Sequence, residues 1–225
     1  MQRPIHSITP FTLLDFPDRV ACILWFAGCN MRCVYCYNPE IVLGKGKVSI
    51  PETEAFLRSR QGLLQGVVFG GGECTSHKSM PTLVETSKQM GYSTKVDTNG
   101  SRPRVLEDLL GRGVLDYVAL DFKALPHRYL DITKSELFAQ FEESFLLLMA
   151  SGIPFEVRTT VHSTLISMDD LAAMTGYLRD KGYTGNYYLQ YAVNDVPTLE
   201  PLPRSSRLNQ PEALSTGNLR ISIRN

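Results

Sequence analysis

The stretch VACILWFAGCNMRCVYC, residues 20–36, decides the fold. It begins with a near-continuous apolar run, which is typical of a strand in a parallel sheet that is covered on both faces. Three cysteines, Cys29, Cys33 and Cys36, follow in the loop directly after that run. Because ligands bind at the carboxyl ends of the strands in parallel β/α folds, this loop predicts a binding site.

The rest of the chain repeats the order of strand and helix. Short apolar, β-branched runs predict strands, and segments with helical spacing predict helices. The predicted strands are 20–26, 66–69, 93–97, 117–121, 155–161 and 187–191, and the predicted helices are 52–61, 79–90, 104–111, 134–151 and 169–181. This alternation predicts the α/β class, with a parallel sheet curved into a partial (β/α)6 TIM-like barrel.

Polar and glycine-rich segments follow the predicted strands. AGCN follows the first strand, GGGECT the second, DTNG the third and DFKA the fourth, while RTTVH ends the fifth. The carboxyl ends of parallel strands meet at one edge of the sheet. We therefore expect one site that is built from many loops.

Length and composition limit the class of protein. A chain of 225 residues can bury a full core as one domain, which we expect to span 1–196, with 197–225 as a C-terminal tail whose role is open. The 23 Lys and Arg residues balance the 23 Asp and Glu residues, which argues against a nucleic-acid or membrane-surface partner. No secretory signal or membrane-spanning apolar run is apparent, so we expect a cytoplasmic protein.

The cysteines favour metal ligation over disulfides. The chain has five, an odd number, and three of them follow the spacing C-x3-C-x2-C. A cubane iron-sulfur cluster usually has about four thiolate ligands, so three would leave one iron open to a chelating small molecule. A zinc site is the alternative, but no second pair of ligands completes it. Cys22, inside the first predicted strand, is interpreted as core packing.

This cysteine spacing, with an aromatic residue between the second and third cysteines and a later GGGE, resembles the radical S-adenosylmethionine (radical SAM) superfamily. The stretch LLDFPDRVACILWFAGCNMRCVYCYNPE, residues 13–40, is similar to the start of the activating enzymes that install glycyl radicals. These are the anaerobic ribonucleoside-triphosphate reductase activating proteins and the pyruvate formate-lyase activating enzyme. The resemblance covers about residues 9–191.

The resemblance implies the catalytic centre and its cofactors. Cys29, Cys33 and Cys36 match the ligands of a 4Fe-4S cluster, whose open iron chelates SAM. Reduction of the cluster cleaves SAM and releases a 5'-deoxyadenosyl radical. Tyr35 matches an aromatic residue beside the adenine, although ordinary packing is the plainer interpretation.

Further residues match cosubstrate contacts of the family. Those in the GGE motif, beside the methionyl amino group, are Gly71, Gly72 and Glu73; this chain has Cys74 where relatives commonly have proline, and we interpret that thiol as buried packing. The remaining candidates follow later strands and are Asp97, Thr98, Asn99, Asp121, Lys123 and Arg158.

The resemblance places a monovalent cation near Asp97, Thr98 and Asp121, and Arg158 near the ribose and carboxylate of SAM. Helix capping is the plainer interpretation of Asp97, and a strand-end salt bridge is that of Arg158. His162 follows the fifth strand and is a weaker candidate for substrate contact.

Three classes of function remain open at this stage. The first is an oxidoreductase that activates a glycyl radical enzyme such as anaerobic ribonucleotide reductase, with reduced flavodoxin or ferredoxin as electron donor. The second is a small-molecule radical SAM enzyme that resembles 7-carboxy-7-deazaguanine synthase. The third is an iron-sulfur binding module without catalysis.

Overall fold

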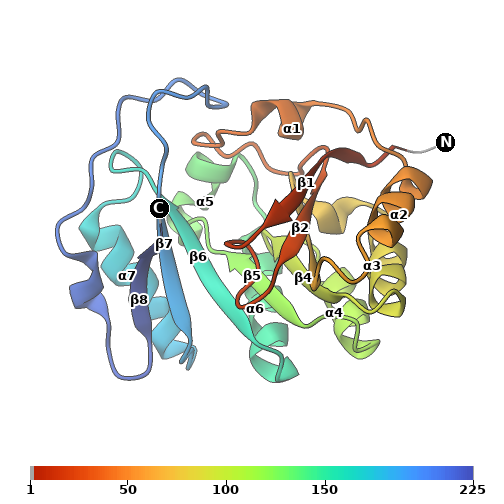
Figure 1. The fold of residues 1–225 in the computed structure, drawn as a ribbon. Coiled ribbons are helices and arrows are strands. Elements are labelled where there is room, and N and C mark those ends of the chain that lie inside the picture. The colour runs from red at the N-terminus through yellow and green to blue at the C-terminus, as the bar shows by residue number, and fades with distance from the viewer. Residues whose placement is uncertain (1–2, 225) are drawn as a thin grey trace.

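A computed structural model describes residues 3–224 of the chain. Its centre is one sheet of eight strands that lie side by side in the order of the sequence (Figure 1). The first pair is antiparallel, and every later neighbouring pair is parallel. The strands are β1 Ile5–Thr12, β2 Ala21–Phe26, β3 Gly66–Gly71, β4 Ser93–Thr98, β5 Tyr117–Asp121, β6 Phe155–Val161, β7 Asn186–Tyr191 and β8 Arg220–Arg224.

The sheet is curved and open, with β1 and β8 as its two edges. The predicted α/β class and partial barrel are therefore confirmed. Two strands lie outside the predicted six-strand set. β1 precedes it and pairs antiparallel with β2, and β8 extends the parallel sheet beyond β7.

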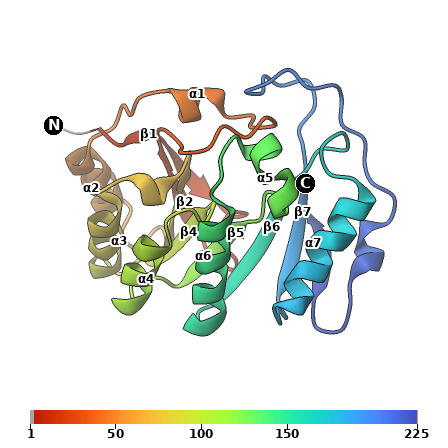
Figure 2. The same ribbon diagram turned by 180° about the vertical axis from the view of Figure 1, so that it is seen from behind.

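Helices cover the outer face of the sheet, as Figure 2 shows for α3, α4, α6 and α7. The predicted helix 134–151 was wrong at its start, because Lys134 adopts a left-handed conformation that ends one helix before the next begins at Phe138. None of the helices in residues 3–224 is both long enough and apolar enough to span a bilayer. The helices are α1 Pro39–Leu43, α2 Ile50–Ser59, α3 Met80–Gln89, α4 Pro103–Gly111, α5 Pro126–Thr133, α6 Phe138–Ser151 and α7 Met168–Asp180, with short 3-10 helices at Cys74–Ser76 and Pro211–Leu214.

The two faces of the sheet differ in chemistry. The outer face packs on the helices with buried residues such as Leu24, Phe69 and Val157. The inner, concave face, which we call the lumen, is apolar beside β2 and β3, where Ile23 and Val68 pack together in a second cluster. From β4 onward, alternate residues bring charged groups into the lumen, because successive side chains of a strand point to opposite faces.

The predicted tail, 197–225, is joined to the rest of the fold, most clearly at its start and at its end. The amide of Leu199 donates to the carbonyl of Cys36 and that of Glu200 to the carbonyl of Val34, so the tail crosses the cysteine loop. Beyond it, the chain returns as β8 and pairs with β7 (Figure 1). The tail therefore contributes a strand to the sheet. The expected domain boundary at residue 196 stays a prediction.

Candidate active site

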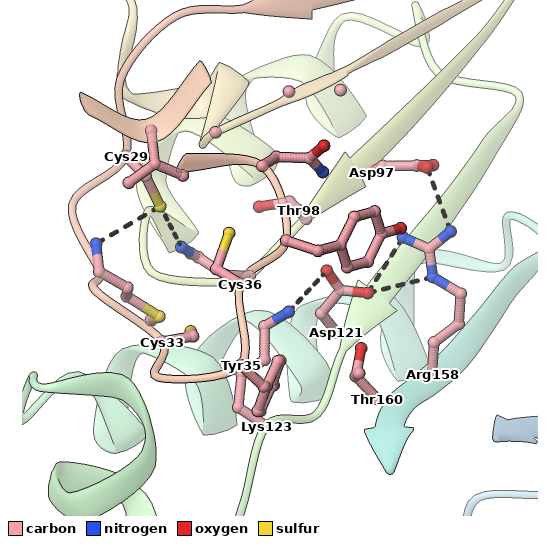
Figure 3. A pocket seen from close by; sticks show the side chains of 18 of the residues that line it. Cys29, Cys33, Tyr35, Cys36, Asp97, Thr98, Asp121, Lys123, Arg158 and Thr160 are labelled. Carbon is pink, nitrogen blue, oxygen red and sulfur yellow. Dashed lines mark hydrogen bonds and ion pairs between the residues drawn. The ribbon is translucent and has the colours of Figure 1, made fainter. Parts of the chain in front are cut away.

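A pocket of about 200 Å³ opens at the carboxyl ends of the parallel strands. Every site residue that the sequence predicted, except Glu73 and the weaker candidate His162, lines this pocket, and Figure 3 shows the cysteines on one side and Asp97, Asp121 and Arg158 on the other. Nine further lining residues were not among the predicted site residues: Asp15, Trp25, Met31, Tyr37, Asn38, Val42, Gly70, Thr160 and Gln190. Asp15 reaches the pocket from the β1–β2 turn, Trp25 from β2 and Val42 from α1.

Backbone hydrogen bonds to the C-terminal end of α5 hold the cysteine loop in place. The amide of Arg32 donates to the carbonyl of Thr133, and that of Val34 donates to the carbonyl of Ile132, each at 2.9 Å. The Cys36 amide donates to the carbonyl of Cys33 at 2.9 Å, which tightens the turn between these two ligand candidates. The loop is therefore shaped by backbone bonds that leave its thiols free to bind a ligand.

Burial changes the acidity of two of these thiols. It raises the pKa of Cys29 to about 12 and that of Cys33 to about 11. A metal ligand must be the thiolate. Both thiols are therefore protonated at neutral pH without a metal, and metal loading releases their protons.

The glycine loop after β3 lies directly against the cysteine loop. The Glu73 amide donates to the carbonyl of Gly28 at 2.9 Å. Gly71 has a φ of +123°, and a Cβ on Gly72 would lie 1.8 Å from the Gly28 carbonyl oxygen. These two positions need glycine because the backbones approach too closely for a side chain.

Glu73 was predicted as a site residue but does not line the pocket. Its side chain is buried and accepts hydrogen bonds from the Thr75 amide, the Thr98 hydroxyl and the Asn99 amide, the last at 2.7 Å. Asn99 in turn donates from Nδ2 to Asn30 at 3.1 Å and lies 3.9 Å from the sulfur of Cys29. Glu73 thus joins the glycine loop to the DTNG loop and places Asn99 against the cysteine loop.

A chain of ion pairs crosses the lumen wall of the pocket (Figure 3). Arg158 on β6 binds Asp97 of β4 at 3.1 Å and Asp121 of β5 at 3.0 Å. Lys123 also binds Asp121, at 3.1 Å, and the buried Lys95 pairs with Asp97. The sequence analysis did not identify Lys95, which precedes the DTNG motif by two residues within β4.

The pKa values of this cluster follow from its pairing. Burial opposes ionisation, but Arg158 and Lys123 hold the pKa of Asp121 below its ordinary value. Burial likewise lowers the pKa of Lys123, yet Asp121 outweighs it and the pKa is raised. Asp121 and Lys123 are therefore both charged at neutral pH. Asp97 does not cap a helix, since the next helix, α4, has Arg102 at its N-cap.

Tyr35 separates the main pocket from a second cavity of about 160 Å³, which it also lines. Its hydroxyl is buried and has no hydrogen-bond partner among residues 3–224. His162 lines only this second cavity, where Nε2 lies 3.0 Å from the carbonyl of Pro203 and Nδ1 lies 2.9 Å from the Thr164 hydroxyl. His162 therefore contacts the C-terminal tail at Pro203. Tyr35, whose hydroxyl has no hydrogen-bond partner in the described part of the chain, lines the same second cavity.

The two cysteines interpreted as packing are buried. Cys22 belongs to the main core on the helix side of β2. Cys74 lies beneath the glycine loop with its sulfur 3.3 Å from the carbonyl oxygen of Phe69. Neither lines the pocket.

Comparisons with known proteins identify the family of this chain. The radical SAM superfamily matches residues 23–173. A Methanocaldococcus jannaschii protein named as a glycyl-radical enzyme activating enzyme is 26% identical over 186 residues, which is 80% of this chain and 77% of that protein. The pyruvate formate-lyase-activating enzyme of Clostridium pasteurianum is 32% identical over 128 residues, which is 53% of this chain and 52% of that enzyme.

A solved structure shows the same fold. Streptococcus suis SuiB bound to S-adenosylmethionine matches with a TM-score of 0.70 at 12% identity, over 88% of this chain and 48% of SuiB. The present chain thus spans about half the length of SuiB and of the Clostridium enzyme. Because the family match covers more than half of the sequence, this chain belongs to the radical SAM superfamily.

Membership of this superfamily implies a 4Fe-4S cluster and SAM. The residues present fit both groups. Three cysteines line the pocket, and each thiolate can bind a different iron of a cubane. Lys123 and Arg158 offer cations to a carboxylate, and Tyr35 offers an unpartnered hydroxyl.

We predict that Gly72→Ala loses most of its iron-binding capacity. The added Cβ would meet the Gly28 carbonyl oxygen and would lie 3.1 Å from the Cys29 amide nitrogen, so the cysteine loop must shift. Iron per chain after anaerobic reconstitution measures the effect. Gly111→Ala is the matched control, because its Cβ at the end of α4 meets nothing within 4 Å. Equal iron in the Gly72 variant and wild type would contradict the role given to this contact.

Proposed function

We propose that this chain is an activating enzyme that installs a glycyl radical in a partner enzyme such as anaerobic ribonucleotide reductase. Cys29, Cys33 and Cys36 hold the 4Fe-4S cluster, and SAM occupies the main pocket. A reduced cluster held there would supply the one electron that splits SAM into methionine and a 5'-deoxyadenosyl radical, and that radical would take a hydrogen atom from a glycine Cα of the partner to give 5'-deoxyadenosine. Reduced flavodoxin or ferredoxin is the proposed electron donor.

The remaining residues of the pocket bind and orient SAM in this proposal. Lys123 and Arg158 attract its carboxylate by charge-assisted hydrogen bonds. The backbone of Gly71 and Gly72 approaches the methionyl amino group, which glycine permits because it has no side chain. Tyr35 packs beside the adenine at the boundary with the second cavity, where its free hydroxyl has room for a partner.

Exposed apolar side chains beside the pocket favour a protein substrate over a small-molecule substrate. Leu13 and Leu14, in the turn that brings Asp15 into the pocket lining, are 63% and 88% exposed, and Phe11 precedes them. Tyr37, a pocket-lining residue of the cysteine loop, is also exposed. Apolar side chains that are grouped around a site indicate contact with another macromolecule, which a small-molecule enzyme does not need. The names of the activating-enzyme relatives support the same choice.

The decisive experiment combines reconstituted protein, SAM and a chemical reductant with anaerobic ribonucleotide reductase from the same organism. We expect a glycyl radical signal in the reductase by electron paramagnetic resonance, formed only when all components are present. Turnover of a small molecule without any partner, and no such signal, would favour the alternative class instead.

Replacing Cys33 with alanine should abolish both cluster binding and SAM cleavage, because the two remaining thiolates cannot hold a cubane that usually has about four ligands. Iron content and 5'-deoxyadenosine formation measure the two effects. Cys22→Ala is the control, since this buried thiol lies outside the pocket lining. A Cys33 variant that cleaves SAM at close to the wild-type rate would refute the ligand assignment.

The substitution Leu14→Asp should raise the concentration of partner needed for half-maximal radical formation by about tenfold, because it places a charge in an apolar contact. SAM cleavage without the partner should stay unchanged. Leu63→Asp is the matched control, because Leu63 is 67% exposed but lies outside the pocket lining. Similar effects of both substitutions would show that the β1–β2 turn is not the docking surface.

Lysine and arginine side chains lie beside the two carboxylates at which the family resemblance suggested a monovalent cation. Asp97 is paired with Lys95 and Arg158, and Asp121 is paired with Lys123 and Arg158. We infer that these side chains balance the carboxylates without an added ion. SAM cleavage at constant ionic strength should therefore be equal in potassium, sodium and tetramethylammonium salts. A rate that depends on potassium or sodium would restore the cation to the site.

A further inference from the structure

The last strand of the sheet brings a second arginine into the lumen. Arg224 of β8 binds Glu156 of β6 through two parallel contacts, Nη1 to Oε1 at 2.7 Å and Nη2 to Oε2 at 3.0 Å. Its guanidinium also lies 3.5 Å from the ring centroid of Tyr188 on β7. A fork-to-fork pair that stacks on an aromatic ring is one of the more strongly oriented contacts that arginine makes.

Glu156 has few other ways to balance its charge. It is fully buried, and its only other side-chain hydrogen bond among the described residues is with the hydroxyl of Tyr117, at 2.9 Å. A tyrosine hydroxyl is a neutral donor, so Arg224 supplies the positive charge. Removing one member of such a buried pair leaves the other charge uncompensated.

Strand register alone does not explain this pairing. Val157 aligns with Tyr187 of β7, and Tyr187 aligns with Ile221 of β8, which puts Glu156 at the level of Arg220. Arg220 nevertheless remains exposed and forms no ion pair within residues 3–224. The backbone of Arg224 is aligned with Gln190, which lines the pocket, so it lies nearer the carboxyl ends of the strands than Arg220 does. Its side chain extends back toward the amino ends of the strands to reach Glu156.

Glu156 is connected to the pocket through Arg158. The two residues lie two positions apart on β6, so both point into the lumen. Burial lowers the pKa of Arg158, but Asp121, Asp97 and also Glu156 raise it. An uncompensated Glu156 would therefore compete with Asp97 and Asp121 for the guanidinium of Arg158.

We propose that Arg224 is a positioning residue for the SAM pocket, because its pairing with Glu156 leaves Arg158 to Asp97 and Asp121. This inference rests on the proposed binding of SAM beside Arg158 and is independent of which partner receives the radical. The proposal also assigns a function to the C-terminal tail, because β8 supplies the positive charge that balances Glu156 beneath the pocket.

The test measures the dissociation constant of SAM by equilibrium dialysis with cluster-reconstituted protein, together with the thermal midpoint Tm. We expect Arg224→Ala to raise the dissociation constant by about tenfold, since a misplaced buried charge acts on a neighbouring site. The double variant Arg224→Ala with Glu156→Gln should bind SAM within about twofold of wild type, because the uncompensated charge is gone. Arg220→Ala, on the same face of the same strand, should bind as wild type does.

The variants separate positioning from simple stabilisation of the fold. A lower Tm of Arg224→Ala with an unchanged dissociation constant would overturn the proposal, as would a double variant that stays tenfold weaker. If Arg224→Ala alone does not fold, the double variant decides by the same criterion. Wild-type protein that fails to bind SAM would overturn both this proposal and the SAM site, whereas a missing glycyl radical with intact SAM binding would count against the activating function alone.

Discussion

The need to balance charges buried inside a curved sheet governs this structure. Arg158 is the centre of that balance, because its guanidinium reaches from β6 to Asp121 on the neighbouring β5 and to Asp97 on β4, and so joins three strands. Lys95 and Lys123 complete the pairing. With each carboxylate between two cations, the wall of the pocket is charged yet held in one arrangement, and a site that orients a ligand needs such a fixed geometry.

The cysteine loop depends on a second kind of constraint, the close approach of backbones. The glycine loop after β3 lies against Gly28, and α5 binds the cysteine loop from the other side through Arg32 and Val34. Glu73 connects this arrangement to the DTNG loop, where Asn99 approaches Cys29. A residue that resemblance assigned to the cosubstrate thus holds three loops together from beneath, and a matching motif does not by itself show which way a side chain points.

The tail is structurally part of the barrel even though its composition suggested an appendage. Its first part binds the carbonyls of Val34 and Cys36, and its last strand continues the sheet. The exposed leucines of the β1–β2 turn lie at the opposite edge strand of the same sheet. The open side of the barrel is therefore bounded by two segments outside the six predicted strands. One of them presents an apolar surface, and the other supplies Arg224 to its ion pair with Glu156.

The sequence by itself determined the α/β class, the six central strands, the three cysteines and most of the pocket lining. These features depend on local signals, namely apolar runs, glycine positions and polar residues at strand ends, which retain their meaning without knowledge of distant contacts. It could not reveal Lys95 as a partner of Asp97, the inward turn of Glu73 or the path of Arg224 to Glu156. Tertiary structure decided these three features. Each depends on the curvature of the sheet, and a long side chain selects its partner only after the strands have been assembled.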